Sequence, residues 1–158
     1  LAPVIPHTAD EVYSYIPGST EVSAYLTDMP LVKTYANAQE VSEKWTKLLS
    51  LRHDVLKALE EARNEKVIGK SLTASLHLYP DAQTKELLES LQADLKQIFI
   101  VSELVIEEGM APEAALQFDG LAVAVKAAEG HTCDRCWLVV NAVNEQGICP
   151  RCSDVVNA

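Results

Sequence analysis

The sequence predicts an α+β protein in three parts: a helical segment over residues 1–69, a small mixed α/β unit over 70–128 and a cysteine-rich ribbon or knuckle over 129–158. Three observations lead to this prediction. Apolar residues recur with helical spacing up to residue 69, and they alternate with polar residues directly after it. All four cysteines of the chain then fall within twenty residues near its end.

Two helices are expected in the first part. Thr8-Ala-Asp-Glu11 has the form of a capping box, so it predicts a short helix that ends near Pro17-Gly18. Asn37-Ala-Gln-Glu40 has the same form and opens a long helix, which we expect to stop at Gly69. The apolar positions of the long helix recur at spacings of three, four or seven: Val41, Trp45, Leu48, Val55, Leu59 and Ala62.

The middle part is expected to contain three strands and one helix. From Ser71 to Tyr79 apolar and polar residues alternate, as in a half-buried strand that Pro80 ends. Asp81 is a candidate cap for a helix whose apolar face is formed by Leu87, Leu88, Leu91, Leu95 and Ile98. Further strands are predicted over residues 99–107 and around Leu121, Val123 and Val125.

The formal net charge of −10 argues against a nucleic-acid partner, because phosphate binding normally depends on clustered Lys and Arg. The distribution of charge weakens that argument. Residues 71–125 hold two Lys against nine acidic residues, whereas 39–70 hold seven basic against six acidic and 126–158 hold three against four. The two nearly neutral segments remain able to meet RNA, although neither is a polybasic patch.

Targeting and membrane signals are missing from the sequence. It contains neither the run of about 18 apolar residues that a membrane helix needs nor a basic start followed by an apolar signal segment. We therefore expect a soluble, cytoplasmic protein that binds no membrane. The chain opens at Leu1 without an initiator Met, which we interpret as a piece of a longer protein.

Cys133, Cys136, Cys149 and Cys152 form two Cys-x-x-Cys pairs separated by twelve residues, a spacing typical of zinc ribbons and knuckles. Four thiolates complete a tetrahedral site and leave no position for a catalytic water, so we predict one structural Zn²⁺. The alternatives are a redox pair, which needs a thioredoxin-like setting, and two disulfides, which need an oxidising compartment. His131 is close enough to compete as a ligand, but the four thiolates already complete the site.

Two side chains beside the cysteines are candidates for contact with RNA. Arg135 is expected to offset the negative charge of zinc bound by four thiolates, either as its only role or together with another. Trp137 either packs over the small metal-centred core, which residue type alone favours, or stacks on an unpaired base while Arg135 offers its planar donor fork.

At this point the sequence resembles the carboxyl-terminal part of bacterial isoleucyl-tRNA synthetases, over essentially the whole chain. Residues 1–11 look like the late segment of the helical anticodon-binding domain that the valine, leucine and isoleucine enzymes share. Residues 52–63 followed by 66–74 are similar to the helix-then-strand signature that closes this domain. Cys133-Asp-Arg-Cys-Trp137 and Cys149-Pro-Arg-Cys152 narrow the resemblance to the isoleucine enzyme.

The resemblance implies a zinc module that helps to recognise the anticodon of isoleucine tRNA, with Arg135 and Trp137 near the anticodon bases. The parent enzyme would be a monomer that joins isoleucine to tRNA-Ile using ATP and binds no DNA. The family's His-Ile-Gly-His and Lys-Met-Ser-Lys-Ser signatures and its editing domain are absent from this sequence. We therefore expect no catalytic residue here, an inactive isolated piece, and ATP only in a catalytic domain elsewhere.

Two other classes of protein stay open. A similar zinc finger ends the formamidopyrimidine-type DNA glycosylases, but the acidic segment ahead of the cysteines does not resemble their helical DNA-binding region. A protein-interaction zinc ribbon would fit the net negative charge and the lack of a basic stripe. Selective binding of damaged duplex DNA would favour the first class, and no nucleic-acid binding even at low salt would favour the second.

Overall fold

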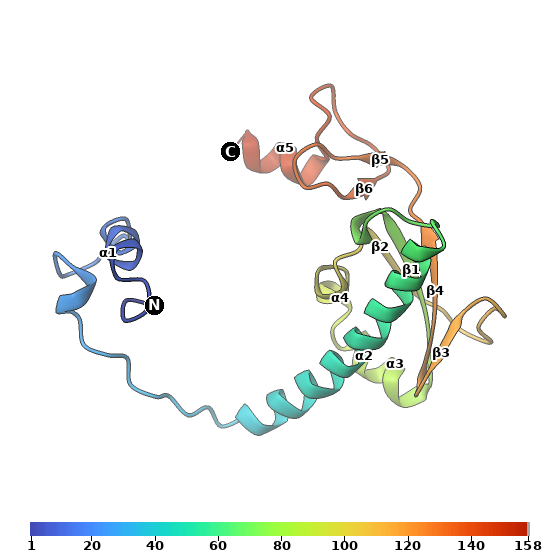
Figure 1. Ribbon diagram of the computed structural model, residues 1–158, viewed down its shortest axis with the longest axis horizontal. Helices are drawn as coiled ribbons and strands as arrows, with labels where there is room; N and C mark the ends of the chain where they lie inside the picture. The colour runs from blue at the N-terminus through green and yellow to red at the C-terminus, as the bar shows by residue number, and fades with distance from the viewer. Residues whose placement is uncertain (158) are drawn as a thin grey trace. The chain divides into compact units, whose positions relative to one another are not determined.

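A computed structural model describes residues 1–157, apart from the side chains of residues 92 and 93. The chain divides into two compact units, one ending at Ala38 and the other beginning at Gln39 (Figure 1). None of the helices in the described residues has the length and apolar content needed to cross a bilayer.

The first unit contains helix α1 (Pro6–Ser14) and the short 3₁₀-helix η1 (Ala24–Leu26), and none of its residues is buried. The capping box predicted at Thr8 is wrong, because α1 begins two residues earlier and has no side-chain cap. Proline fits the first turn of a helix, where its missing N–H is not needed, so Pro6 sets the start. Asp10, inside the predicted box, instead accepts hydrogen bonds from Ser23 Oγ at 2.6 Å and Ala24 N at 2.9 Å.

Helix α2 (Ala38–Asn64) begins where the sequence predicts and buries one face in the second unit: Leu48, Leu51, Val55, Ala58, Leu59 and Ala62. Val41 and Trp45, which were predicted to belong to this apolar face, are partly exposed, so the buried face begins only at Leu48. The helix ends before Gly69 because Lys66 adopts a left-handed backbone with φ of 62°. Val67 N then donates to Ala62 O at 2.9 Å, which closes the helix in the manner of a Schellman motif.

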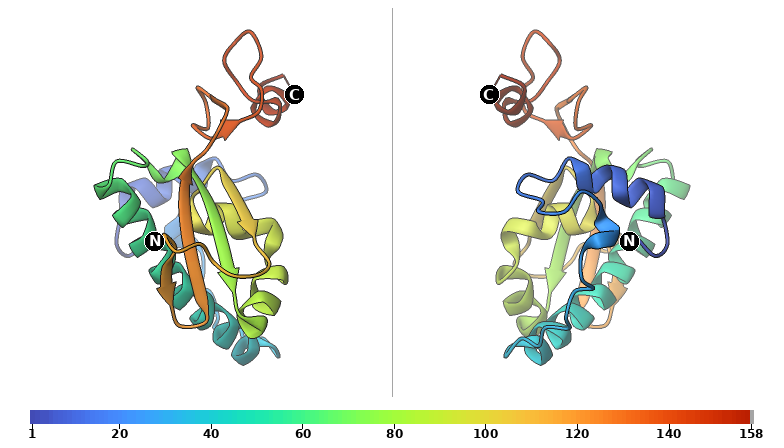
Figure 2. Two further views of the ribbon diagram at one scale, coloured as in Figure 1. Left: turned by 90° about the vertical axis from the view of Figure 1, so that its right-hand side faces the viewer. Right: turned by 90° about the vertical axis from the view of Figure 1, so that its left-hand side faces the viewer.

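The second unit is built around a four-stranded sheet with the order β2-β1-β4-β3. Strands β1 (Ala74–Pro80) and β2 (Glu103–Ile106) are parallel, and β4 (Leu121–Ala127) pairs antiparallel with both β1 and β3 (Leu116–Phe118). Helices α2, α3 (Ala82–Glu89) and α4 (Gln92–Phe99) lie on one side of the sheet (Figure 2). The strand around Leu121 is confirmed. The strand predicted over Ser71–Tyr79 begins only at Ala74, because residues 71–73 form a 3₁₀-helix, and it includes Pro80, which was expected to end it. The short β3 was not predicted.

The segment after β1 differs from the single helix predicted there. The cap at Asp81 is confirmed, because its Oδ1 accepts a hydrogen bond from Thr84 N at 2.7 Å. The helix breaks at Ser90 into α3 and α4, and Leu88 and Leu95, one on each half, are both buried in the core. The strand predicted over 99–107 is shortened, because the left-handed residue Ile100 ends α4 and the strand begins at Glu103.

The capping carboxylate of Asp81 is expected to make stability depend on pH. The backbone N–H of Thr84, which donates to it, lowers its pKa below the ordinary value of 3.8. A carboxyl group whose pKa is lowered on folding stabilises the folded state at pH values above its pKa in the unfolded chain. This stabilisation is lost as the pH falls through its pKa in the folded state. Asp81→Asn keeps a capping oxygen but does not titrate. As the pH falls from about 5 to about 3, the wild type should therefore lose stability relative to this variant. Urea unfolding across this range tests the prediction, and a difference independent of pH would contradict it.

Candidate metal centre

The four cysteines come from two short elements at the end of the chain. Strands β5 (His131–Thr132) and β6 (Val139–Val140) pair as an antiparallel hairpin, and the loop between them carries Cys133 and Cys136. Helix α5 (Pro150–Val156) begins directly after Cys149 and carries Cys152 in its first turn. The two Cys-x-x-Cys pairs therefore lie on a hairpin loop and at the start of a helix (Figure 1).

The sulfur atoms of the four cysteines lie within 4.8 Å of one another, and those of Cys136 and Cys149 are 3.8 Å apart. Three of the cysteines are buried, and none forms a disulfide. A tetrahedral zinc site with Zn–S bonds of about 2.3 Å has sulfur atoms about 3.8 Å apart. Both the donor set and the spacing therefore fit a bound metal ion, and they do not fit the alternative of two disulfides.

Backbone contacts hold the two cysteine pairs against each other. Cys149 N donates to Cys133 Sγ at 3.2 Å, and Asp134 N donates to Gly147 O at 2.9 Å. Gly147 has a φ of 73°, a left-handed backbone that glycine adopts without strain. Asn144 supports the same turn, because its Oδ1 accepts hydrogen bonds from the backbone of Gln146 and Ile148. The sequence reasoning missed Asn144, although an Asn three residues before a Gly is a signal for such a turn.

The surroundings of the sulfur atoms favour thiolates at two positions. A hydrogen bond from the backbone N–H of Cys136 lowers the pKa of Cys133 to about 6. The Arg135 guanidinium, with Nη1 3.6 Å from Cys152 Sγ, lowers the pKa of Cys152. Burial has the opposite effect at Cys136 and raises the pKa of its thiol to about 11. A bound cation would supply the positive charge that holds all four groups as thiolates.

The structure distinguishes between the roles expected for the residues beside the cluster. Arg135 is exposed, and its contact with Cys152 fits the charge-offsetting role. Trp137 is 65% exposed, so its ring does not pack over the cluster and the interpretation that residue type favoured is wrong. His131 lies exposed on β5, outside the group of four sulfur atoms.

Trp137 also has a left-handed backbone, with φ of 62°, in the turn where its N–H donates to Cys133 O at 2.8 Å. This conformation costs a residue with a Cβ roughly 1–2 kcal/mol, and glycine adopts it freely. Trp137→Gly should therefore make the metal-bound module about 1 kcal/mol more stable than Trp137→Ala, which keeps the Cβ. Competition for the metal by a chelator measures this difference. Equal stability of the two variants would show that the left-handed turn is not strained.

A second constellation lies on the sheet, away from the cysteines. His77 Nδ1 is 2.7 Å from Glu107 Oε1, and its Nε2 is 3.3 Å from Ser75 Oγ. These residue types occur together in hydrolase triads, but Ser75, the second residue of β1, is only 4% exposed, so a substrate cannot reach its hydroxyl. The arrangement links β1 to the chain just after β2 and is structural.

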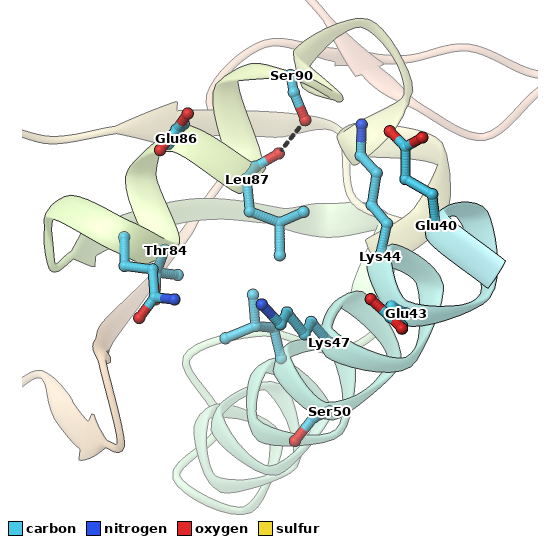
Figure 3. Close-up of a pocket in the computed structure, with 11 residues that line it drawn as sticks. Glu40, Glu43, Lys44, Lys47, Ser50, Thr84, Glu86, Leu87 and Ser90 are labelled. Atoms are coloured by element: carbon cyan, nitrogen blue, oxygen red, sulfur yellow. Dashed lines mark hydrogen bonds between the residues drawn. The ribbon is translucent and has the colours of Figure 1, made fainter. Parts of the chain in front are cut away.

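A groove of about 550 Å³ runs between α2 and α3. Lys44 and Lys47 project into it from α2, beside Glu40 and Glu43, and Leu87 points across it from α3 (Figure 3). The close mixture of positive and negative side chains makes the groove a poor site for phosphate, and none of the four cysteines lines it.

Comparison with known proteins identifies the family of this chain. Residues 1–78 match the family described as the anticodon-binding domain of tRNA ligase. Over 99% of its length the chain is 52% identical to isoleucine–tRNA ligase of Bacillus cytotoxicus, and 51% identical to those of Bacillus cereus and Bacillus anthracis. The chain belongs to the isoleucine–tRNA ligase family. It spans 18% of the length of these relatives.

The two comparisons cover different lengths of the chain. The anticodon-binding match includes α1, α2 and most of β1, and it stops before the metal centre. The isoleucine–tRNA ligase matches extend over the four cysteines as well. The resemblance to this family is confirmed, which argues against both the DNA glycosylase and the general interaction ribbon.

Proposed function

We propose that this chain is the anticodon-binding and zinc-bearing portion of an isoleucine–tRNA ligase, which joins isoleucine to tRNA-Ile using ATP. The observation that carries the proposal is the 52% identity to such a ligase over 99% of the chain, together with the anticodon-binding match. The portion would comprise the end of the helical domain (1–69), a junction unit (70–128) and the zinc module (129–158). ATP and the catalytic residues would lie elsewhere in a longer, monomeric, cytoplasmic protein that binds neither membrane nor DNA.

The proposed metal is a single structural Zn²⁺ held by Cys133, Cys136, Cys149 and Cys152. The all-sulfur donor set and the 3.8 Å sulfur spacing support zinc, which prefers a tetrahedral site of this kind. Four protein ligands leave no open position, so the ion would hold the hairpin to α5 and take no part in the reaction.

The proposed RNA contacts are Arg135 and Trp137. The Trp137 ring is 65% exposed and is held at a left-handed turn, in a conformation that costs stability without burying the ring. Anticodon bases are unpaired, so they can be splayed out and stacked on such a ring, while Arg135 beside it can donate to base edges or phosphate. Stacking is a mechanism that an acidic chain can use, because it does not depend on a basic surface.

The test is a titration of the zinc-loaded chain with tRNA-Ile and with a non-cognate tRNA, at low and moderate salt. Trp45→Phe provides the background in which Trp137 is the only tryptophan, so quenching reports on the proposed site. Trp137→Ala removes this fluorophore, so its affinity is measured by the retention of labelled tRNA on a filter, as is that of the wild type. The variant should bind tRNA-Ile roughly 5- to 150-fold more weakly, as expected for a stacked base worth about 1–3 kcal/mol. Val155→Ala, which truncates an exposed apolar residue on α5, is the matched control and should bind as the wild type does.

The outcomes separate the parts of the proposal. A preference for tRNA-Ile that disappears in Trp137→Ala would support anticodon recognition through the zinc module. Equal affinity of this variant and the wild type would exclude Trp137 as a contact and leave recognition to the helical part. Failure of the wild type to bind any tRNA at low salt would overturn the proposed function of this chain.

A further inference from the structure

The metal module has a hydrophobic core of its own. Its buried residues, Cys133, Ile148, Cys149 and Cys152, form a cluster with Val140 and Val143 that is separate from the core under the sheet. The chain passes from β4 into the module through residues 128–130 (Figure 1). Two cores that do not merge move independently unless specific contacts join them.

One serine hydroxyl joins the module to the α/β unit. Ser102 Oγ donates to Leu72 O in the 3₁₀-helix η2 (Ser71–Thr73) and accepts a hydrogen bond from Val139 N of β6 at 2.7 Å. Among the described residues, this is the only hydrogen bond or ion pair between residues 131–157 and the rest of the chain. The partners are 30 and 37 residues from Ser102, so the bridge depends on the tertiary fold.

The position of the bridging hydroxyl is fixed from the sheet side. Val101, which precedes Ser102, is 1% exposed and donates its N–H to Lys96 O at 3.0 Å. The left-handed residue Ile100 turns the chain so that Val101 enters the core. The hydroxyl proton is used by Leu72 O, which leaves an oxygen lone pair available to the N–H of Val139.

The module side of the joint is equally constrained. Gly130 has a φ of 131°, and a Cβ there would lie 2.3 Å from Val140 O, so the linker passes close against β6. Strand β6 begins at Val139, two residues after Trp137. The bond to Ser102 therefore acts on the segment that directly follows the exposed tryptophan.

We propose that Ser102 is a positioning residue that fixes the orientation of the metal module on the α/β unit and thereby aims Arg135 and Trp137 at RNA. The RNA part rests on the proposed function. Without the bridge the module samples further orientations, and apparent affinity falls in proportion to the fraction that remains competent. Loss of one hydrogen bond of ordinary strength corresponds to about a fivefold change.

The test compares Ser102→Ala with Ser102→Thr, which retains a hydroxyl, in the zinc-loaded chain. Ser90→Ala is the matched control, because Ser90 Oγ also donates to a backbone carbonyl, that of Leu87 at 2.7 Å, but bridges nothing (Figure 3). NMR residual dipolar couplings report the alignment of the module relative to the sheet, and amide exchange reports the Val139 N–H. Zinc affinity and tRNA-Ile affinity are measured on the same samples.

In Ser102→Ala the couplings of the module should shrink relative to those of the sheet, and Val139 should exchange about fivefold faster or more. Zinc affinity should stay unchanged, and tRNA-Ile should bind about fivefold more weakly. Ser102→Thr should restore each value, and Ser90→Ala should match the wild type. A purely structural role would lower stability without changing the relative alignment.

Unchanged alignment in Ser102→Ala would overturn the inference, and so would lost alignment with unchanged tRNA affinity. If Ser102→Ala does not fold, Val139→Pro removes the donor instead and must produce the same loss of alignment. Failure of the wild type to bind tRNA would overturn the proposed function, and the alignment data would still decide whether Ser102 fixes the module.

Discussion

Replacing Cys133 with serine is expected to abolish metal binding and unfold residues 129–157, while the α/β unit stays folded. Cys133 is fully buried, and its sulfur also accepts the hydrogen bond from Cys149 N. The buried core of the module consists of three cysteines and Ile148, which is too little apolar surface to fold so short a segment. Structural zinc supplies roughly 10–16 kcal/mol of apparent binding free energy at neutral pH, and this energy is what folds such modules.

Amide hydrogen exchange and zinc stoichiometry measure this result. Protection should disappear in β5, β6 and α5 and persist at core residues of the sheet such as Leu76. His131→Ser is the matched control, because His131 lies close to the cluster but is exposed and outside it, so the variant should bind one zinc ion. A chelator should reproduce the Cys133→Ser result in the wild type. Persistent protection of the module after both treatments would show that the metal does not fold it.

The metal centre could be predicted from the sequence because its geometry is local. Each Cys-x-x-Cys pair places two sulfur atoms on one turn, and a short segment carries both pairs. The exposure of Trp137 could not be predicted in the same way. Residue type favours packing, but the ring is directed by the left-handed backbone at this position, and glycine, the usual indicator of such a backbone, is absent there.

The misplaced helix boundaries have a related cause. Apolar spacing continues from Leu87 through Leu91 to Leu95, so periodicity alone predicts one helix. The helix breaks where Leu91 N donates to Leu88 O at 3.0 Å, three residues back, instead of to the carbonyl four residues back that an α-helix requires. The end of α2 also lacks a sequence signal, because Lys66 adopts the left-handed backbone at a position that glycine usually occupies.

Long-range contacts carry no sequence signal at all. Ser102 looks like an ordinary residue before a strand, yet its hydroxyl joins two chain segments that are distant in sequence. Asp10 illustrates the opposite error, since a pattern that resembles a local cap serves a contact with Ser23, 13 residues away. The cysteine cluster is determined by spacing, whereas the joint that orients it is determined only by the packed core.

Truncating the core residue Phe99 is expected to destabilise the α/β unit strongly. Phe99 ends α4, is fully buried and belongs to the same cluster as Leu59, Leu76 and Leu88. Phe99→Ala should lower the free energy of unfolding by about 3–5 kcal/mol, because the lost apolar contacts and the remaining cavity add together. Met110→Ala, at a residue 95% exposed, is the control and should change the free energy by less than about 0.5 kcal/mol.

Urea unfolding followed by circular dichroism measures the loss, and chelator competition measures zinc affinity in the same variant. Zinc affinity should stay at the wild-type value under conditions where the variant is still folded, because the core that contains Phe99 and the core around the cysteines do not share residues. A fall in zinc affinity that parallels the fall in stability would mean that the two cores fold as one. In that case the orientation of the metal module would be set by shared packing, and a single hydroxyl at Ser102 could not control it.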